Sequence, residues 1–348
     1  MNAPSPPRHV RSTPAIHASL PAVLVIGLTL GVFGSPARAQ LGVDSTVALP
    51  TSAAIPNTIA PPRIGGYIQA RQTAVEGVGY SAFLNRARAS VDGALPAKFA
   101  YRLLVEFQAS AGVRAPATVS LREAVARWNP APFSVTAGEF KTPFTREYLI
   151  PVPALEVADL AVAVDSIAPK YDVGMMAEYA YGPYSTISVG VFNGDGANSI
   201  ANRDSVAIVI ARATVRPIPQ LSLGGSYSRD SPDSSRWGVD AAAQHMGVGV
   251  RAEYLTRHVD GREASKQEFG WYVLEGVRVV PRVTLYARQE DYQRPLIGAA
   301  RRVRAYEYAV NYDIAPGKVR LLLQFTRRIA GVKSQRLDTA LAQVQVQL

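Results

Sequence analysis

The feature that most constrains this chain is a two-residue alternation of apolar and polar side chains, which recurs from residue 63 to the last residue. In residues 98–108 the charged and amide side chains all fall on even positions, and the aromatic ones on odd positions. The same pattern returns in residues 248–257 and 319–328 and closes the chain at 343–348. Because successive side chains of a strand point to opposite faces, each segment predicts a strand with one apolar face and one wet face.

About 16 such segments follow one another, each near the 9 to 11 residues that a tilted strand needs to cross a bilayer. The connectors between them alternate between tight turns and longer polar stretches. The tight ones are residues 129–132, 182–183, 216–219, 245–247, 280–282 and 315–317, and the longer ones are 194–204, 229–235, 260–266, 292–303 and 330–337. This alternation is typical of an up-and-down barrel. We therefore predict an all-β fold, a closed antiparallel transmembrane β-barrel over residues 63–348.

The first 39 residues have the order of a secretory signal. Arg8 and Arg11 precede an uncharged stretch at 20–33, and small residues surround Ala39, after which we place the cleavage. A membrane anchor is the alternative, but about 14 apolar residues span only about 21 Å as a helix, short of a bilayer core of about 30 Å. Residues 40–62 are rich in Pro, Ser, Thr and Ala, which predicts a flexible periplasmic lead.

Composition excludes several kinds of chemistry. The chain has no cysteine, so disulfides, thiolate metal sites and cysteine nucleophiles are ruled out. No Walker A or GxSxG motif occurs, and His245 and His258 have no recognisable catalytic partners in the sequence. We predict no catalytic residues, no cofactor, no metal and no nucleic-acid partner. A barrel hydrolase that relies on these histidines or on paired carboxylates stays as an alternative.

Two segments carry a family resemblance. Residues 84–93 (LNRARASVDG) and 135–144 (VTAGEFKTPF) resemble strands of the phosphate-selective porin O and P family, and residues 171–174 and 191–194 are similar to later motifs of that family. The resemblance implies a 16-stranded trimeric barrel in the outer membrane of a Gram-negative bacterium, in contact with its lipid. It also implies passive diffusion of small anions, phosphate-like solutes among them. Leu348 departs from the aromatic residue that usually ends such barrels.

Charge on the inner face of a wide barrel sets which ions enter. By alternation, we expect eight arginines to point inward as pore-lining, anion-binding residues: Arg86, Arg88, Arg102, Arg251, Arg257, Arg288, Arg320 and Arg328. The same phase places Glu106, Glu253, Glu307 and other acids on this face, so many of these charges could instead form ion pairs along the wall. Arg301, Arg302 and Arg304 are candidates for an anion funnel at a rim.

The connector at 142–170 is much longer than the others and contains an apolar run at 155–164. Exposed at a rim, this run would be costly, so we predict that the connector folds into the lumen or packs against a neighbouring subunit. In the family that the sequence resembles, the corresponding loop narrows the pore, which makes Lys141 and Arg146 candidates at the constriction, together with Glu147. A structural barrel plugged by this loop is the remaining alternative.

Overall fold

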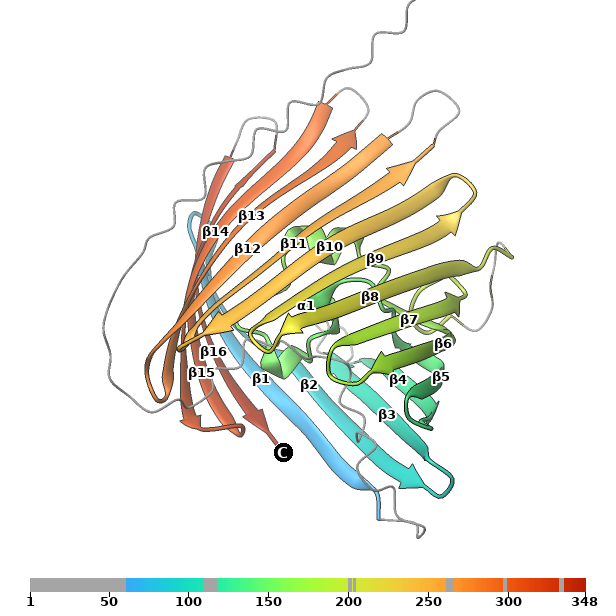
Figure 1. The fold of residues 1–348 in the computed structure, drawn as a ribbon. Helices are drawn as coiled ribbons and strands as arrows, with labels where there is room; N and C mark the ends of the chain where they lie inside the picture. The colour runs from blue at the N-terminus through green and yellow to red at the C-terminus, as the bar shows by residue number, and fades with distance from the viewer. Residues whose placement is uncertain are drawn as a thin grey trace, which may run out of the picture. The chain divides into compact units, whose positions relative to one another are not determined.

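A computed structural model describes residues 61–108, 118–199, 202, 205–260, 266–296, 299–331 and 335–348. The described residues form 16 antiparallel strands, each bonded to its neighbours in sequence, and β1 pairs with β16 to close the sheet (Figure 1). The predicted fold class is therefore confirmed. The strands are β1 (Arg63–Val75), β2 (Gly79–Leu95), β3 (Phe99–Gln108), β4 (Thr118–Trp128), β5 (Phe133–Lys141), β6 (Tyr171–Tyr181), β7 (Ser185–Phe192), β8 (Ile208–Ile218), β9 (Leu221–Ser231), β10 (Ser234–His245), β11 (Val248–Val259), β12 (Lys266–Val280), β13 (Val283–Leu296), β14 (Ala299–Ala315), β15 (Val319–Ala330) and β16 (Gln335–Gln347).

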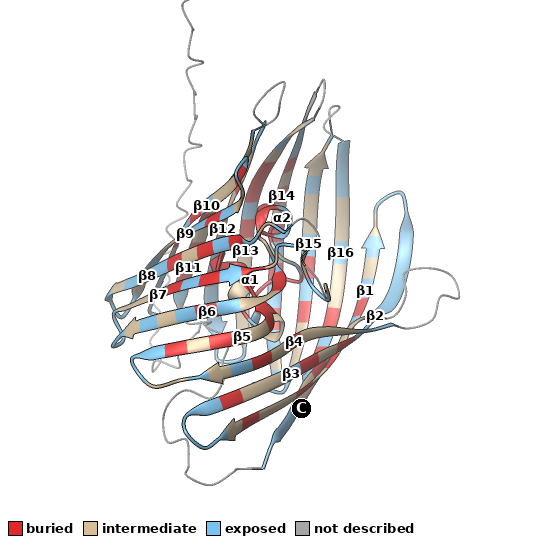
Figure 2. Ribbon diagram, turned by 90° about the vertical axis from the view of Figure 1, so that its right-hand side faces the viewer, coloured by how far each residue is buried: buried red, intermediate tan, exposed pale blue. Residues whose placement is uncertain are grey.

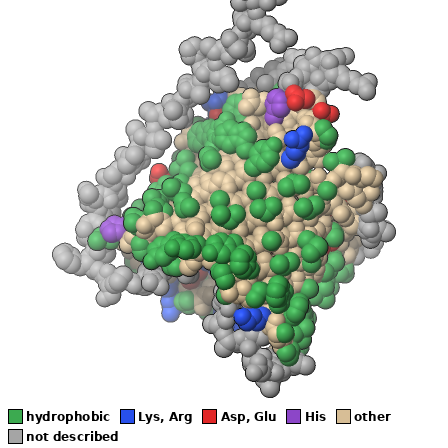
Figure 3. Space-filling view, turned by 45° about the vertical axis from the view of Figure 1, so that its right-hand side comes forward, with side chains coloured by type: hydrophobic (Ala, Val, Ile, Leu, Met, Phe, Trp, Pro, Cys, Tyr) green, Lys and Arg blue, Asp and Glu red, His purple; other side chains and the backbone are tan. Residues whose placement is uncertain are grey.

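The outward face of the barrel is apolar. Side chains such as Ile187, Val239 and Leu323 are half exposed there, while their neighbours in sequence are buried or partly buried inside. Figure 3 shows one such face, where hydrophobic side chains are spread widely and charged ones gather toward the edges. Alternation of buried and exposed residues along the strands is visible in Figure 2. A closed wall with an apolar exterior suits the hydrocarbon core of a membrane.

Two predicted loops are wrong. Residues 229–235 and 292–303 were expected as long connectors, but β9 runs to Ser231 and β10 begins at Ser234, while β13 runs to Leu296 and β14 begins at Ala299. The outward side chains at these strand ends are polar, so an alternation of apolar and polar residues does not identify them as strand. The connectors after β3, β5, β7 and β11 lie at one rim and are longer, as predicted. The connectors at the other rim are all tight turns.

Aromatic side chains lie on the exterior near the short-turn rim of β3–β6, as expected of rings that sit at headgroup level. Phe99 contacts Trp128, and Phe133 contacts Tyr179, with ring centroids 6.5 Å and 4.9 Å apart. Tyr148 and Tyr171, by contrast, are buried and contact each other edge to face, with ring centroids 5.9 Å apart. Their contact belongs to the connector described next.

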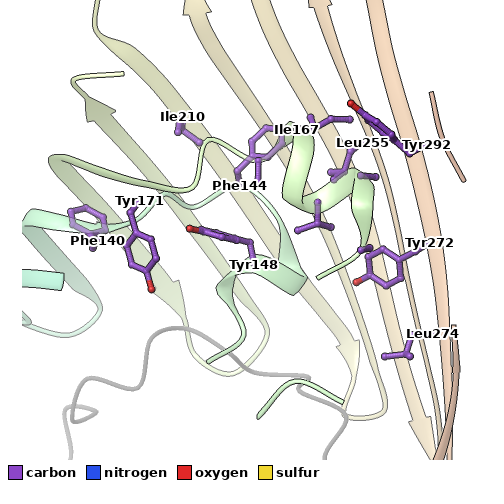
Figure 4. Close-up of a cluster of buried hydrophobic side chains, with 14 of the residues drawn as sticks. Phe140, Phe144, Tyr148, Ile167, Tyr171, Ile210, Leu255, Tyr272, Leu274 and Tyr292 are labelled. Atoms are coloured by element: carbon purple, nitrogen blue, oxygen red, sulfur yellow. The ribbon is translucent and has the colours of Figure 1, made fainter. Parts of the chain in front are cut away.

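The connector between β5 and β6 carries α1 (Arg146–Leu149), the short helix η1 (Val152–Ala154) and α2 (Val162–Ile167). We call residues 142–170 the inner segment. Its apolar side chains form a core with the inward side chains of the wall, and Ile167 lies close to Leu255 and Tyr292 (Figure 4). Gly270 of β12 gives α2 room, since a Cβ there would lie 2.7 Å from the Cβ of Ala163. The segment therefore packs on the inward face of the strands.

Within the described residues, no helix is long and apolar enough to cross a membrane. The predicted signal at 1–39 and nearly all of the lead at 40–62 lie outside the residues that the structure describes.

Candidate pore lining

Three arginines of β11, β13 and β1 hold the middle of the inner segment. Arg251 donates to both carboxylate oxygens of Glu156, at 2.8 and 2.9 Å. Arg288 lies between Glu147 and Glu307, at 3.0 and 2.8 Å. Arg71 donates to Asp159 at 3.0 Å and to the carbonyl of Ala158. Paired, planar contacts of this kind fix geometry as well as charge, so the segment is tied to strands far apart around the barrel.

A second anchor lies at the start of the segment. The Asp240 carboxylate accepts from Arg146 and from Arg212, both at 2.6 Å, and Arg146 also donates to Ser222 at 2.9 Å. The space for this arrangement comes from Gly224 of β9, where a Cβ would lie 2.5 Å from the Asp240 oxygens. Two guanidinium groups therefore share one buried carboxylate.

Lys141 ends β5 and faces the inner segment. Its Nζ donates to the carbonyls of Tyr148 and Ile150, at 2.5 and 2.8 Å, and the residue is buried. Tyr148 belongs to α1, and Ile150 directly follows that helix. The ammonium group thus meets backbone carbonyls of the segment and not open water, so it ties the end of β5 to the segment.

Glu147 is the acidic centre of the inner segment. Its carboxylate accepts from Arg288 at 3.0 Å and from the backbone N–H of Ala161 at 2.8 Å, and Arg251 lies 3.6 Å away. Burial raises the pKa of the Glu147 carboxyl, while Arg288 and Arg251 oppose that shift. The two guanidinium groups therefore offset part of the cost of burying this carboxylate.

The wall formed by β2, β3 and β4 faces the lumen with a surplus of positive charge. Its inward side chains include five arginines and three carboxylates within the described residues, namely Arg86, Arg88, Arg102, Arg122 and Arg127 with Asp92, Glu106 and Glu123. Arg88 and Arg122 share Glu106, and Arg102 lies 3.1 Å from Glu123 and 3.4 Å from Asp92. Two more guanidinium groups than carboxylates leave this wall attractive to anions.

A cavity of about 70 Å³ lies between this wall and the start of the inner segment. Arg102, Arg127, Lys141 and Arg212 line it together with Glu123 and Glu178. Arg127 donates to the Thr136 hydroxyl at 3.0 Å, and the described ion pairs do not include it. The cavity therefore combines a cationic lining with an arginine that has capacity for a further acceptor.

The predicted pore residues fall into three groups. Lys141, Arg251, Arg288 and Arg320 bind the inner segment, and Arg146 belongs to that segment and binds Asp240 of the wall. Arg320 contacts the carbonyls of Pro153 and Leu155 and also pairs with Asp313. Arg86, Arg88 and Arg102 lie on the β2–β4 wall. Arg257, which is 3.9 Å from Asp230, and Arg328 lie toward the rim with longer connectors. Half of the predicted set thus serves as anchors.

Sequence reasoning missed Arg122, Arg127 and Arg212. The pairing of β3 with β4 shifts between Leu104 and Val105, so Arg122 is an extra residue and the alternation of β4 changes phase there. In β8, apolar side chains occupy both faces because Ile208 and Ile210 contact the inner core. In the sequence, both segments have apolar side chains on both faces, and this ambiguous alternation was the signal that could have pointed to the three arginines.

The two histidines of the enzyme alternative lie at opposite rims. His245 ends β10 at a tight turn, and His258 lies 2.9 Å from the exposed Asp260 near the end of β11. In the described part of the chain, no group of three or more His, Asp or Glu side chains could hold a metal ion.

Comparison with known proteins agrees with this geometry. Residues 75–229 match the model of the family described as phosphate-selective porin O and P. The outer membrane channel DcaP of Acinetobacter baumannii has a similar fold, with a TM-score of 0.66 and 13% identity over 82% of this chain and 97% of that one. An anion-selective porin from Comamonas acidovorans gives a TM-score of 0.64 at 9% identity, over 83% and 99% of the two chains. OmpT of Vibrio cholerae, in its trimer form, gives a TM-score of 0.61 at 13% identity, over 83% of this chain and 99% of that one. No curated protein matches the sequence.

The closed barrel, its apolar exterior and its charged lumen define an outer-membrane channel of the porin type. The match of residues 75–229 to the model described as phosphate-selective porin O and P confirms the resemblance seen in the sequence. Family and fold point to a channel and not to an enzyme, in the outer membrane of a Gram-negative bacterium.

Proposed function

We propose that this channel passes small anions by passive diffusion, phosphate-like solutes among them, along the β2–β4 wall. The observation that carries the proposal is the excess of arginine over carboxylate on that wall, next to a cavity lined by Arg102 and Arg127. A guanidinium group stays charged at any relevant pH and offers phosphate oxygens a planar fork of donors. The inner segment fills the opposite side of the lumen, so ions would follow the cationic side.

The test is the reversal potential of single channels in planar bilayers with asymmetric KCl. We expect the native channel to favour chloride and the double variant Arg102→Glu with Arg127→Glu to favour potassium. The matched control is Arg282→Glu with Lys318→Glu, which places the same charge change on the short-turn rim, where salt screens it over about 10 Å at 0.1 M. Equal shifts in both variants would refute a path along this wall. A native protein without conductance would favour the plugged barrel.

We also propose that the mature chain begins at Gln40 and assembles as a homotrimer. A basic, apolar and small-residue order at 1–39 supports the cleavage, and a trimer form of a similar barrel supports the assembly. The intact mass of the protein from outer membranes and cross-linking in detergent measure the two properties.

A further inference from the structure

The outward face of β13–β16 changes from apolar to polar along one line of the strand register. The last apolar row is Ala287, Tyr308, Phe325 and Ala340, which are direct cross-strand neighbours. The next row toward the rim with longer connectors is Gln289, Tyr306, Arg327 and Asp338. Four adjacent strands make the change together, so it marks a boundary of the barrel's exterior and not an isolated charge.

Beyond that line the described exterior of β13–β16 carries four arginines and two aspartates, which we call the outer arginine plate: Arg302, Arg304, Arg327, Arg336, Asp291 and Asp338. Arg302 Nε donates to both oxygens of Asp291 at 3.0 Å. Arg327 and Arg336 share Asp338, at 3.0 and 3.1 Å. Each carboxylate therefore orients at least one guanidinium group on the surface.

The arginines of the plate remain accessible. The side chains of Arg302, Arg327 and Arg336 are 51%, 40% and 53% exposed, whereas Asp291 and Asp338 are only 11% and 13% exposed. The described ion pairs do not include Arg304, whose direct cross-strand neighbour is Asp291. The carboxylates thus lie beneath, and a net positive layer of guanidinium groups faces outward.

This placement corrects the predicted anion funnel for two of its three members, Arg302 and Arg304. Arg302 and Arg304 lie on the same face as Tyr308, which points away from the lumen. They therefore face the membrane and cannot attract ions to the channel mouth as lumenal side chains would.

We propose that the outer arginine plate binds the phosphate groups of a phosphorylated glycolipid in the outer leaflet, with the lipid's acyl chains on the apolar row below. Arginine is costly at the centre of a bilayer but is tolerated near its interfaces, and longer connectors mark the external rim. Guanidinium groups match phosphate geometry through paired donors. Charge complementarity and the adjoining apolar row select a lipid over a free anion.

The experiment measures binding of bis-phosphorylated lipid A to the detergent-solubilised full channel by native mass spectrometry. The test variant is Arg304→Gln with Arg336→Gln, which leaves Asp291 paired with Arg302 and Asp338 with Arg327. We expect at least about fivefold weaker binding, with conductance and reversal potential unchanged because the plate lies outside the lumen. Dephosphorylated lipid A should bind native and variant channels equally.

The matched control is Arg282→Gln with Lys318→Gln on the opposite rim, which should bind as the native channel does. Equal binding of phosphorylated lipid by the test variant and the native channel would overturn the inference. A change of oligomeric state with unchanged lipid binding would also overturn it and assign the face to a second copy of the chain. Neither outcome depends on the ion preference proposed above.

Discussion

At the scale of single residues, the partner of each inward arginine decides its role. Arg251 and Arg288 meet carboxylates of the inner segment and are almost fully buried. Removing one member of such a buried pair leaves an uncompensated charge, which costs about 3–5 kcal/mol in typical cases. Arg127, in contrast, donates to a hydroxyl beside a cavity. The first kind of arginine holds the segment, and the second remains open to a solute.

Two neighbouring glycines offer a test at this scale. In Gly224→Ala the new Cβ would lie 2.5 Å from Asp240 and 2.7 Å from Arg212, whereas in Gly225→Ala the nearest atom is 4.0 Å away. We expect the first change to destabilise the folded barrel by about 1–3 kcal/mol, as overpacking does. We expect the second to be nearly silent. Equilibrium urea unfolding in vesicles measures both, and equal effects would contradict the role of Gly224.

At the scale of elements, the inner segment is held by partners from many strands. Its contacts come from β1, β9, β10, β11, β13 and β15, among others. The strands, however, bond only to one another through the backbone ladders of the barrel. The wall should therefore fold without the segment, while the segment needs the wall.

Replacing residues 146–167 with a short Gly-Ser linker separates these two parts. We expect the variant to keep its β-sheet circular dichroism and heat-modifiable migration on gels, and to conduct several times more current, because the linker would leave most of the lumen to water. Shortening the connector at 261–265 is the control and should leave conductance unchanged. An unaltered current in the first variant would mean that the segment does not limit the path.

The strands could be predicted from sequence because alternation is a local property, and the alternating segments at 98–108, 248–257 and 319–328 coincide with β3, β11 and β15. The course of the inner segment could not be. Glu147 and Arg288 are 141 positions apart, and no local pattern encodes their contact. Arg122 was missed for a different reason, since one extra residue in β4 reverses the phase that alternation assumes.

At the scale of the whole molecule, the rows of outward side chains determine how the barrel sits in the membrane. On β14 the outward series runs from Ile314 through Val310 to Tyr306, and arginines follow at 304 and 302. At about 3.4 Å per residue and a tilt of about 40°, the backbone rises about 21 Å from Ile314 to Tyr306, close to the apolar band of about 25 Å found in such barrels. Val310 should therefore lie near the middle of the hydrocarbon layer.

Two substitutions to arginine test that depth. Val310→Arg places a charge in the middle of the apolar band and should destabilise the barrel by about 2–4 kcal/mol, whereas Gln289→Arg lies in the first polar row and should cost about 0–1 kcal/mol. Both side chains point outward, so neither change alters the lumen. Urea unfolding in vesicles gives the two free energies, and reversal potentials verify that the channel is unchanged. Similar costs at both positions would mean that the polar row lies within the hydrocarbon layer, and the outer arginine plate could then not be at headgroup level.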